Sequence, residues 1–189
     1  MIIIFWSPSR EGKTAQSMSI LANAMRIHYG LTVYTFHNYK KIVSLLNTRF
    51  KNRREYIFLD CGNHMDDTVR KLFQIADTVV VTFPQQKSVI STYFQEHHRI
   101  FGNIFYLFCN SYRNLLDSEK MCRYIWRLKE EEIGVLPFHC RFEQYYEKNL
   151  GYFYQKKIAE KKNFGEEEEF DNQICKITLK LLKMNCLFS

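Results

Sequence analysis

The sequence lacks the features of several protein classes. No run of about eighteen apolar residues occurs, so no segment is expected to span a membrane as a helix. The apolar N-terminal run has no basic segment before it, which is not the pattern of a secretory signal. The six cysteines and six histidines show no C-x-x-C pair or other metal-ligand spacing, so we expect buried, reduced thiols in a cytoplasmic protein.

Positive charge is in excess but is not concentrated in any segment. The formal net charge is +7 and the pI is near 9.1, yet Lys and Arg form no compact block. Such an excess permits binding to nucleic acid or to an anionic membrane surface, but it does not by itself indicate either. No internal repeat is present.

The chain has ample material for a hydrophobic core. Apolar residues make up 46% of its 189 residues, and 16 Phe and 12 Tyr predict that the core is partly aromatic. We therefore expect a single domain over residues 1–189, with its core in residues 1–140 and a helical part in residues 141–189.

Apolar runs alternate with amphipathic segments along most of the chain. Strands are expected at residues 2–6, 31–36, 56–59, 78–83, 104–109 and 133–136. Helices are expected at residues 15–25, 39–50, 66–76, 87–99, 117–131, 141–162 and 171–187, with a charged loop at 161–169. This order predicts an α/β fold: a doubly wound, mostly parallel sheet of about six strands with helices on both faces and a C-terminal helical extension.

The segment Ser7-Pro-Ser-Arg-Glu-Gly-Lys-Thr14 lies between the first strand and the first helix, the context of a phosphate-binding loop. A helix N-terminus offers unpaired N–H groups and a positive dipole end to an anion. Gly12 permits close backbone approach, Lys13 would reach the β- and γ-phosphates, and the Thr14 hydroxyl would ligate Mg²⁺. Ser7 stands where the pattern G-x-x-x-x-G-K-[ST] begins with glycine. The alternative is an ordinary strand–helix turn with a solvated Lys13.

Polar residues also follow the other expected strands. In parallel sheets, ligands bind beyond the carboxyl ends of the strands. The polar residues at these ends are Ser7–Thr14, His37 and Asn38, Asp60, Gln85 and Gln86, Asn110 and the turn at Pro137. Alternative interpretations are a strand-end cap for Asp60 and a turn former for Asn110.

Five motifs, in this order, resemble the ParA/MinD family of P-loop ATPases, which includes the ATPase domains of bacterial tyrosine kinases and pilus-localising proteins. They span residues 1–140. They are Ser7-x-x-x-Glu-Gly-Lys-Thr14, Tyr56-Ile-Phe-Leu-Asp60, Ile75-Ala-Asp-Thr-Val-Val-Val-Thr-Phe-Pro84, Phe108-Cys-Asn110 and Ile133-Gly-Val-Leu-Pro137. The Ser-x-x-x-Glu-Gly-Lys form is closer to the tyrosine-kinase branch.

The resemblance implies a role for each matched residue. Lys13 and Asp60 would be the catalytic residues, and Thr14 and Asp60 would hold Mg²⁺. Asn110 would hydrogen-bond the adenine edge, and Pro137 and Phe138 would line the base pocket. The phosphate-binding residues would be Ser7, Pro8, Ser9, Arg10, Glu11, Gly12, Lys13, Thr14 and Ala15.

The chain departs from the family at several positions. Pro8 stands where dimer-forming members carry a Lys that reaches the partner's phosphates. His37 stands where the second strand of the family ends in Asp, and Cys61-Gly-Asn63 replaces two prolines, which predicts a more flexible loop. No Tyr-rich tail supports autokinase activity. A displacement of about 1 Å can cost ~10²-fold in rate, so the departures affect hydrolysis more than nucleotide binding.

The leading hypothesis is an ATP- or ADP-binding switch or localisation and partitioning ATPase with Mg²⁺. Its nucleotide state would control homodimerisation or association with a protein partner. The alternative is a catalytically inactive P-loop scaffold. The choice of ATP over GTP rests on the resemblance, since no Asn-Lys-x-Asp guanine motif is present.

The basic, amphipathic segment from Ile174 to Met184 allows two interpretations. It would either dock on the sheet or, as in MinD-like proteins, attach the protein peripherally to a membrane. We favour docking, because the sheet otherwise has few helices for one face.

Overall fold

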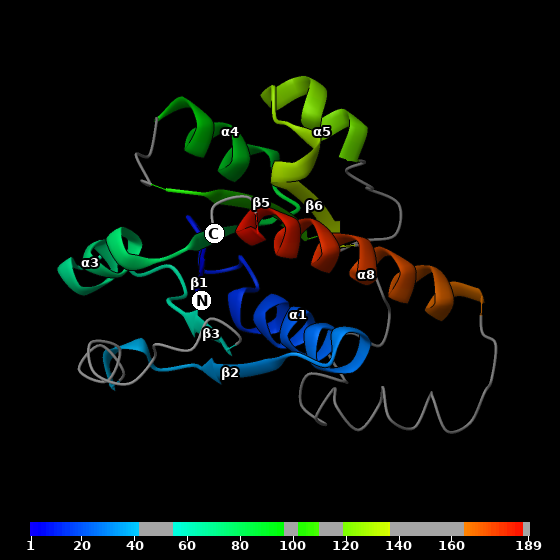
Figure 1. Cartoon of the computed structure of the whole chain (residues 1–189). Coiled ribbons are helices and arrows are strands. Elements are labelled where there is room, and N and C mark those ends of the chain that lie inside the picture. Colours follow the sequence, from blue (N-terminus) through cyan, green and yellow to red (C-terminus); the bar gives the residue numbers. More distant parts are fainter. Residues whose placement is uncertain (42–54, 97–101, 110–118, 137–164, 187–189) are drawn as a thin grey trace.

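A computed structural model describes residues 1–41, 55–96, 102–109, 119–136 and 165–186. These residues form a six-stranded sheet in the order β2-β3-β1-β4-β5-β6, in which every neighbouring pair is parallel (Figure 1). The strands are β1 (Ile2–Trp6), β2 (Thr32–Phe36), β3 (Glu55–Asp60), β4 (Thr78–Pro84), β5 (Ile104–Cys109) and β6 (Ile133–Leu136).

Helices cover both faces of this sheet (Figure 1). One face packs against α1 (Thr14–Tyr29) and α8 (Gly165–Cys186). The other packs against α3 (Asp67–Ile75), α4 (Lys87–Gln95) and α5 (Glu119–Trp126). The predicted doubly wound α/β fold is confirmed, and the sheet is parallel throughout the described strands.

The two faces of the sheet have different cores because successive strand residues point to opposite sides. Ile3 and Phe5 of β1 face the aliphatic side chains of α1 and α8, whereas Ile4 and Trp6 face α3 and α4. The second core is strongly aromatic, and ring stacking extends to α5, where the centroids of Phe94 and Trp126 are 4.9 Å apart. Because both faces are covered, the central strands β1 and β4 are largely apolar and buried, which makes them recognisable in the sequence.

The connections that follow the central strands leave the sheet on opposite sides. β1 continues into α1 on one face, while its neighbours β3 and β4 lead to α3 and α4 on the other. Diverging connections open a crevice at the carboxyl ends of these strands, which is where ligands bind in such sheets. The topology therefore places the turn after β1 in the expected binding position.

Several of the expected element boundaries are wrong. The helix expected at 15–25 continues to Tyr29. The helix expected at 117–131 ends at Trp126, because Arg127 takes a left-handed conformation with φ 53°, and a short 3-10 turn, η2 (Glu130–Glu132), follows. The loop expected at 161–169 is helical from Gly165 onward. Four consecutive glutamates then lie near the helix N-terminus, where the dipole favours negative charge.

Other expectations lie partly or wholly outside the described residues. Of the helix expected at 39–50, the structure describes a 3-10 turn, η1 (Tyr39–Lys41). The helix expected at 87–99 is observed over Lys87–Gln95. The helix expected at 141–162 lies outside the described residues.

The last helix, α8, docks on the sheet. Its apolar residues Ile174, Ile177, Leu181 and Met184 are at most 7% exposed, and they pack with α1 and β6. A Cβ on Gly134 of β6 would lie 3.0 Å from Ile177 Cγ2, so glycine allows the close approach of α8 to this strand. The docking interpretation is confirmed, because this apolar face is buried against α1 and the sheet. None of the described helices is long and apolar enough to cross one.

Candidate functional site

The candidate site begins where β1 ends and the chain turns toward α1. Ser7 is fully buried and its side chain lies against Gly12. A Cβ built on Gly12 would lie 1.8 Å from Ser7 Oγ and 2.2 Å from Ser7 Cβ. Position 12 therefore requires glycine because the Ser7 side chain occupies the space that a Cβ would fill. The close approach expected at Gly12 is made by this side chain.

Oxygen atoms of the loop accept hydrogen bonds from several of its own backbone amides. The Ser9 amide donates to Ser7 Oγ at 3.1 Å, and the Glu11 amide donates to Ser9 Oγ at 3.2 Å. The Gly12 amide donates to the Ser9 carbonyl oxygen at 3.2 Å. Ser7 and Ser9 therefore close the turn through these three hydrogen bonds.

Lys13 and Thr14 lie at the start of α1. Lys13 is the N-cap residue and has φ 54° and ψ 34°, a left-handed conformation that costs a non-glycine residue about 1 kcal/mol. Strain of this kind tends to concentrate at functional sites. Thr14 is 8% exposed, and the first turn of α1 contains no acidic residue. The positive end of the helix dipole is therefore not neutralised from within the helix.

The charge of Lys13 also acts at the end of β5. Burial raises the pKa of the Cys109 thiol to about 11, while a hydrogen bond with Ser17 and the charge of Lys13 act in the opposite direction. Ser17 Oγ and Cys109 Sγ are 3.4 Å apart. Lys13 and Ser17 of the α1 region thus lie close enough to the end of β5 to influence the Cys109 thiol.

Asp60 is the last residue of β3 and pairs with Phe5 of β1. Its side chain is 13% exposed, and Oδ1 accepts a hydrogen bond of 2.9 Å from the Gly62 amide. The Gly62 carbonyl in turn accepts a hydrogen bond of 2.8 Å from the Ser7 amide. One carboxylate oxygen therefore caps the turn after β3, as the alternative interpretation expects, and this turn is bonded to the start of the phosphate-loop candidate.

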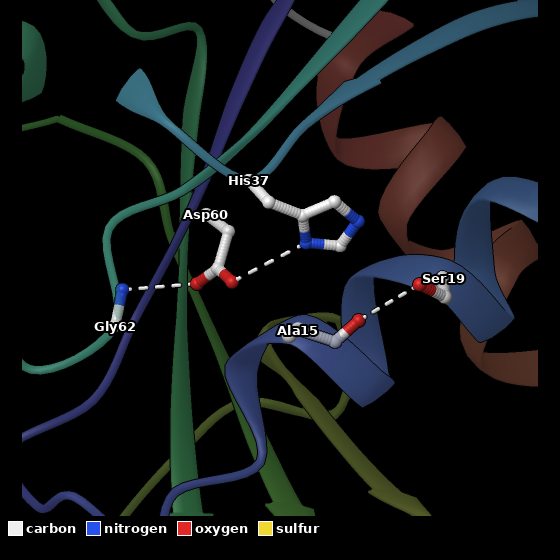
Figure 2. Close-up of polar contacts among 5 residues, drawn as sticks. All are labelled: Ala15, Ser19, His37, Asp60 and Gly62. Atoms are coloured by element: carbon white, nitrogen blue, oxygen red, sulfur yellow. Dashed lines mark hydrogen bonds and ion pairs between the residues drawn. The ribbon is translucent and has the colours of Figure 1, made fainter. Parts of the chain in front are cut away.

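The second carboxylate oxygen of Asp60 faces His37, as Figure 2 shows. His37 Nδ1 lies 3.6 Å from Asp60 Oδ2, and the imidazole is 53% exposed. Together they border a cleft of about 320 Å³ between the ends of β2 and β3. The residues that line it are His37, Asn38, Tyr39, Lys40, Asp60, Cys61, Gly62 and His64.

Asp66 contacts Tyr39 and Lys40, two of the residues that line this cleft. As the N-cap of α3 it accepts a hydrogen bond of 2.9 Å from the Val69 amide, which lowers the pKa of its carboxyl. The hydroxyl of Tyr39 donates to Asp66 at 3.0 Å and the ammonium of Lys40 lies 3.5 Å away, and both lower this pKa further. Burial and the hydrogen bond to Asp66 raise the pKa of Tyr39 to about 12.

A contact between Glu11 and Gln86 joins the loop to the connection after β4. Gln86 Nε2 donates a hydrogen bond to Glu11 Oε2, and Gln86 is the N-cap of α4. The sequence predicted polar residues at this strand end, but not their contact with the loop. The loop is therefore bonded to both neighbouring connections, through Gly62 on one side and Gln86 on the other.

The turn after β3 is held by hydrogen bonds within itself and to β1. The Cys61 amide donates to Phe5 O at 2.9 Å and the His64 amide to Cys61 O at 3.1 Å. The indole Nε1 of Trp6 donates to the His64 carbonyl oxygen at 2.8 Å. The glycine predicted a flexible turn, but the contacts with β1 that hold it could not be derived from the sequence.

The oxygen donors of the site have the chemistry that Mg²⁺ prefers. Thr14 offers a hydroxyl and Asp60 a carboxylate, and Mg²⁺ in nucleotide sites takes its other ligands from water and phosphate. In the part of the chain that the structure describes, no cluster of three or more His, Cys, Asp or Glu could hold a metal by itself. Thr14 and Asp60 therefore fit the oxygen chemistry of a Mg²⁺ site in which phosphate and water supply the other ligands.

Three of the predicted nucleotide-binding residues cannot be placed. Asn110, Pro137 and Phe138 lie outside the described residues, so their roles at the base remain predictions. Cys109 and Leu136, which precede Asn110 and Pro137, are Cα partners in neighbouring strands. The strand ends that lead into the predicted base pocket are thus adjacent.

Comparison with known proteins shows the fold. No protein-family model matches the chain, and no curated protein sequence matches it significantly. A plasmid partition protein from Borrelia burgdorferi B31, in a structure bound to AMPPNP, superposes with a TM-score of 0.62 at 13% identity. The match covers 95% of this chain and 98% of that one. A second B. burgdorferi plasmid partition protein superposes with a TM-score of 0.52 at 14% identity, covering 82% and 98%. The chain therefore shares the fold of these plasmid partition proteins.

Proposed function

We propose that this protein is an ATP-binding switch of the partitioning type, in which nucleotide state controls self-association or association with a protein partner. The observation that carries the proposal is the turn from β1 into α1, with Gly12, Lys13 and Thr14 at the N-terminus of a 16-residue helix. The plasmid partition protein that shares this fold was solved with AMPPNP, an ATP analogue, which supports ATP as the ligand.

The proposed roles follow from the chemistry of each group. Lys13 and the backbone amides of the loop bind phosphate oxygens, because a helix N-terminus favours anions. Thr14 and Asp60 hold Mg²⁺, which neutralises charge on the phosphates when it is bound. Asn110, Pro137 and Phe138 contact the adenine.

The switch proposal rests on the connections of the loop. The Ser7 amide bonds to Gly62 after β3, and Glu11 bonds to Gln86 after β4. A γ-phosphate that moves the loop would displace both of these contacts, and the segments that lead to α3 and α4 would respond. Ordering of segments by a γ-phosphate is an established type of nucleotide switch.

Isothermal titration with Mg-ATP tests nucleotide binding. We expect the wild-type protein to bind and Lys13→Ala to lose at least tenfold in affinity, since the ammonium would contact phosphate directly. Lys71→Ala is the matched control, because Lys71 is an exposed lysine on α3 away from the loop. Equal binding by all three proteins would exclude the phosphate-loop assignment.

Sedimentation velocity tests the switch. The protein is compared with Mg-AMPPNP, with Mg-ADP and without nucleotide, and we expect the association state to differ between AMPPNP and ADP. Identical sedimentation in all three conditions, at protein concentrations well above the nucleotide Kd, would contradict control of self-association and leave association with a partner as the remaining form of the proposal.

A second candidate function is a P-loop scaffold that does not hydrolyse ATP. It is favoured by Pro8, which replaces the loop lysine of dimer-forming relatives, and by His37, which replaces an aspartate. A steady-state ATPase assay distinguishes the two. Hydrolysis that disappears in Asp60→Ala would rule out the scaffold, whereas nucleotide binding without turnover would support it.

A further inference from the structure

The phosphate-loop candidate contains a hydroxyl group that competes for a phosphate-binding amide. Ser9 Oγ accepts a hydrogen bond of 3.2 Å from the Glu11 amide, at an exposed part of the loop. In a phosphate-binding loop the backbone amides that precede the lysine must point at the phosphate oxygens. The Glu11 amide cannot donate a full hydrogen bond to both acceptors.

We infer that Ser9 sets the nucleotide affinity of this loop by holding the Glu11 amide closed until phosphate replaces the hydroxyl. The inference rests on the proposed function, because it concerns the affinity of the same site. The Ser9 hydroxyl satisfies the hydrogen-bonding capacity of the Glu11 amide. When nucleotide binds, the amide must break this hydrogen bond to donate one to a phosphate oxygen. The free energy of the broken bond is subtracted from the binding free energy.

The position of Ser9 distinguishes it from the neighbouring serine. Ser7 Oγ is fully buried and packs against Gly12, so replacing it would change the shape of the loop. Ser9 is only half-buried and its bond to the Glu11 amide is exposed, so water can replace the hydroxyl. Removal of the Ser9 hydroxyl should therefore leave the Glu11 amide bonded to water, with which phosphate competes more easily, without unfolding the turn.

The expected effect of Ser9→Ala is a gain in affinity. A hydrogen bond of this kind changes an equilibrium by about threefold to tenfold, so the Kd for Mg-ATP should fall by about that factor. Ser9→Thr keeps the hydroxyl and should not show this gain in affinity. Ser19→Ala is the matched control, because the Ser19 hydroxyl donates to the Ala15 carbonyl oxygen at 2.9 Å and its removal frees no amide (Figure 2).

Titration calorimetry with Mg-ATP on wild type, Ser9→Ala, Ser9→Thr and Ser19→Ala measures the affinities. Amide hydrogen exchange of Glu11, followed by NMR in the ligand-free proteins, reports the bond itself. Tighter binding and faster Glu11 exchange in Ser9→Ala alone would establish the inference. Unchanged or weaker binding by a folded Ser9→Ala protein, or unchanged Glu11 exchange, would overturn it while wild-type binding upholds the proposed function. Absence of binding by all four folded proteins would overturn the proposed function and the inference with it.

Discussion

The turn from β1 into α1 and the cleft beside Asp60 lie at neighbouring strand ends but are built in different ways. The turn is held by backbone atoms and by a buried serine that contacts Gly12. The cleft is lined largely by side chains, and His37 at its edge is 53% exposed. A substitution in a tightly packed turn forces the backbone to move. An exposed side chain can be replaced with little change in its neighbours, because water fills the space and solvates them. We therefore expect substitutions in the turn to have larger effects than substitutions in the cleft.

The largest effect is expected at Gly12. In Gly12→Ala the new Cβ would lie 1.8 Å from Ser7 Oγ, so the loop must shift. Overpacking of this kind costs roughly 1–3 kcal/mol, and nucleotide binding should be lost with the loop conformation. Thermal melting and titration with Mg-ATP measure the two effects.

The double variant Ser7→Gly/Gly12→Ala sharpens this prediction. Removing the Ser7 side chain removes the two shortest contacts of the new Cβ and leaves one of 3.2 Å to the Ser9 carbonyl oxygen, so the double variant should melt above Gly12→Ala. If the two variants melt at the same temperature, the contact between Ser7 and Gly12 is not the reason for glycine at position 12.

Asp60→Asn should distinguish the contribution of the metal to binding from that of the nucleotide itself. The amide oxygen of Asn can still accept from Gly62, so the turn after β3 should persist, while the charge that would hold Mg²⁺ is lost. We expect about tenfold weaker binding of Mg-ATP and little change in ADP binding with EDTA. Asp67→Asn, at an exposed position in α3, is the control. Equal losses with and without Mg²⁺ would show that Asp60 acts through the fold and not through the metal.

His37→Asn should have a smaller effect. The imidazole lies 3.6 Å from Asp60 but is half-exposed, and contacts of this type contribute little. We expect the melting temperature and the Mg-ATP affinity to remain close to those of wild type. A loss as large as that of Asp60→Asn would mean that the cleft is as constrained as the turn, and the contrast between them would fail.

The smallest effect is expected from Asp66 and depends on pH. The pKa of its carboxyl is lowered in the folded protein, mainly by the Val69 amide, from an ordinary value of 3.8. The carboxylate therefore stabilises the fold above pH 3.8, and this contribution is lost as the pH falls through the lowered folded-state pKa. In Asp66→Asn the melting temperature should fall less with decreasing pH in this acid range than it does in wild type. Thermal scans at a series of pH values measure this. Parallel pH profiles would contradict this prediction.

The sheet could be predicted from the sequence because its strands are buried on both faces. Largely apolar runs such as Ile2–Trp6 and Thr78–Pro84 are recognisable without tertiary information, and their alternation with helices defines the fold class. The end of α5 could not be predicted, because it depends on the left-handed conformation of Arg127. The start of α8 was missed because a run of glutamates is typical of both a solvated loop and a helix N-terminus.

The candidate site was predictable as a location but not in its internal contacts. The motif Gly12-Lys-Thr14 and the strand-end position of Asp60 follow from local sequence. The fit of Ser7 against Gly12, the hydroxyl of Ser9 on the Glu11 amide and the hydrogen bond to Gln86 depend on the folded path of the loop. These contacts form only once the loop has its folded conformation, so the spacing of residues in the sequence does not predict them.

Thermal unfolding with Mg-ATP, with Mg-ADP and without nucleotide, on wild type and Lys13→Ala, tests the central claim most directly. A ligand at a hundredfold excess over its Kd stabilises the folded state by about 2.7 kcal/mol. For a chain of this size that is a rise of roughly 5–10 °C in melting temperature. We predict such a rise in wild type and its loss in Lys13→Ala. An unchanged melting temperature with both nucleotides, or an equal rise in the variant, would contradict nucleotide binding at this loop.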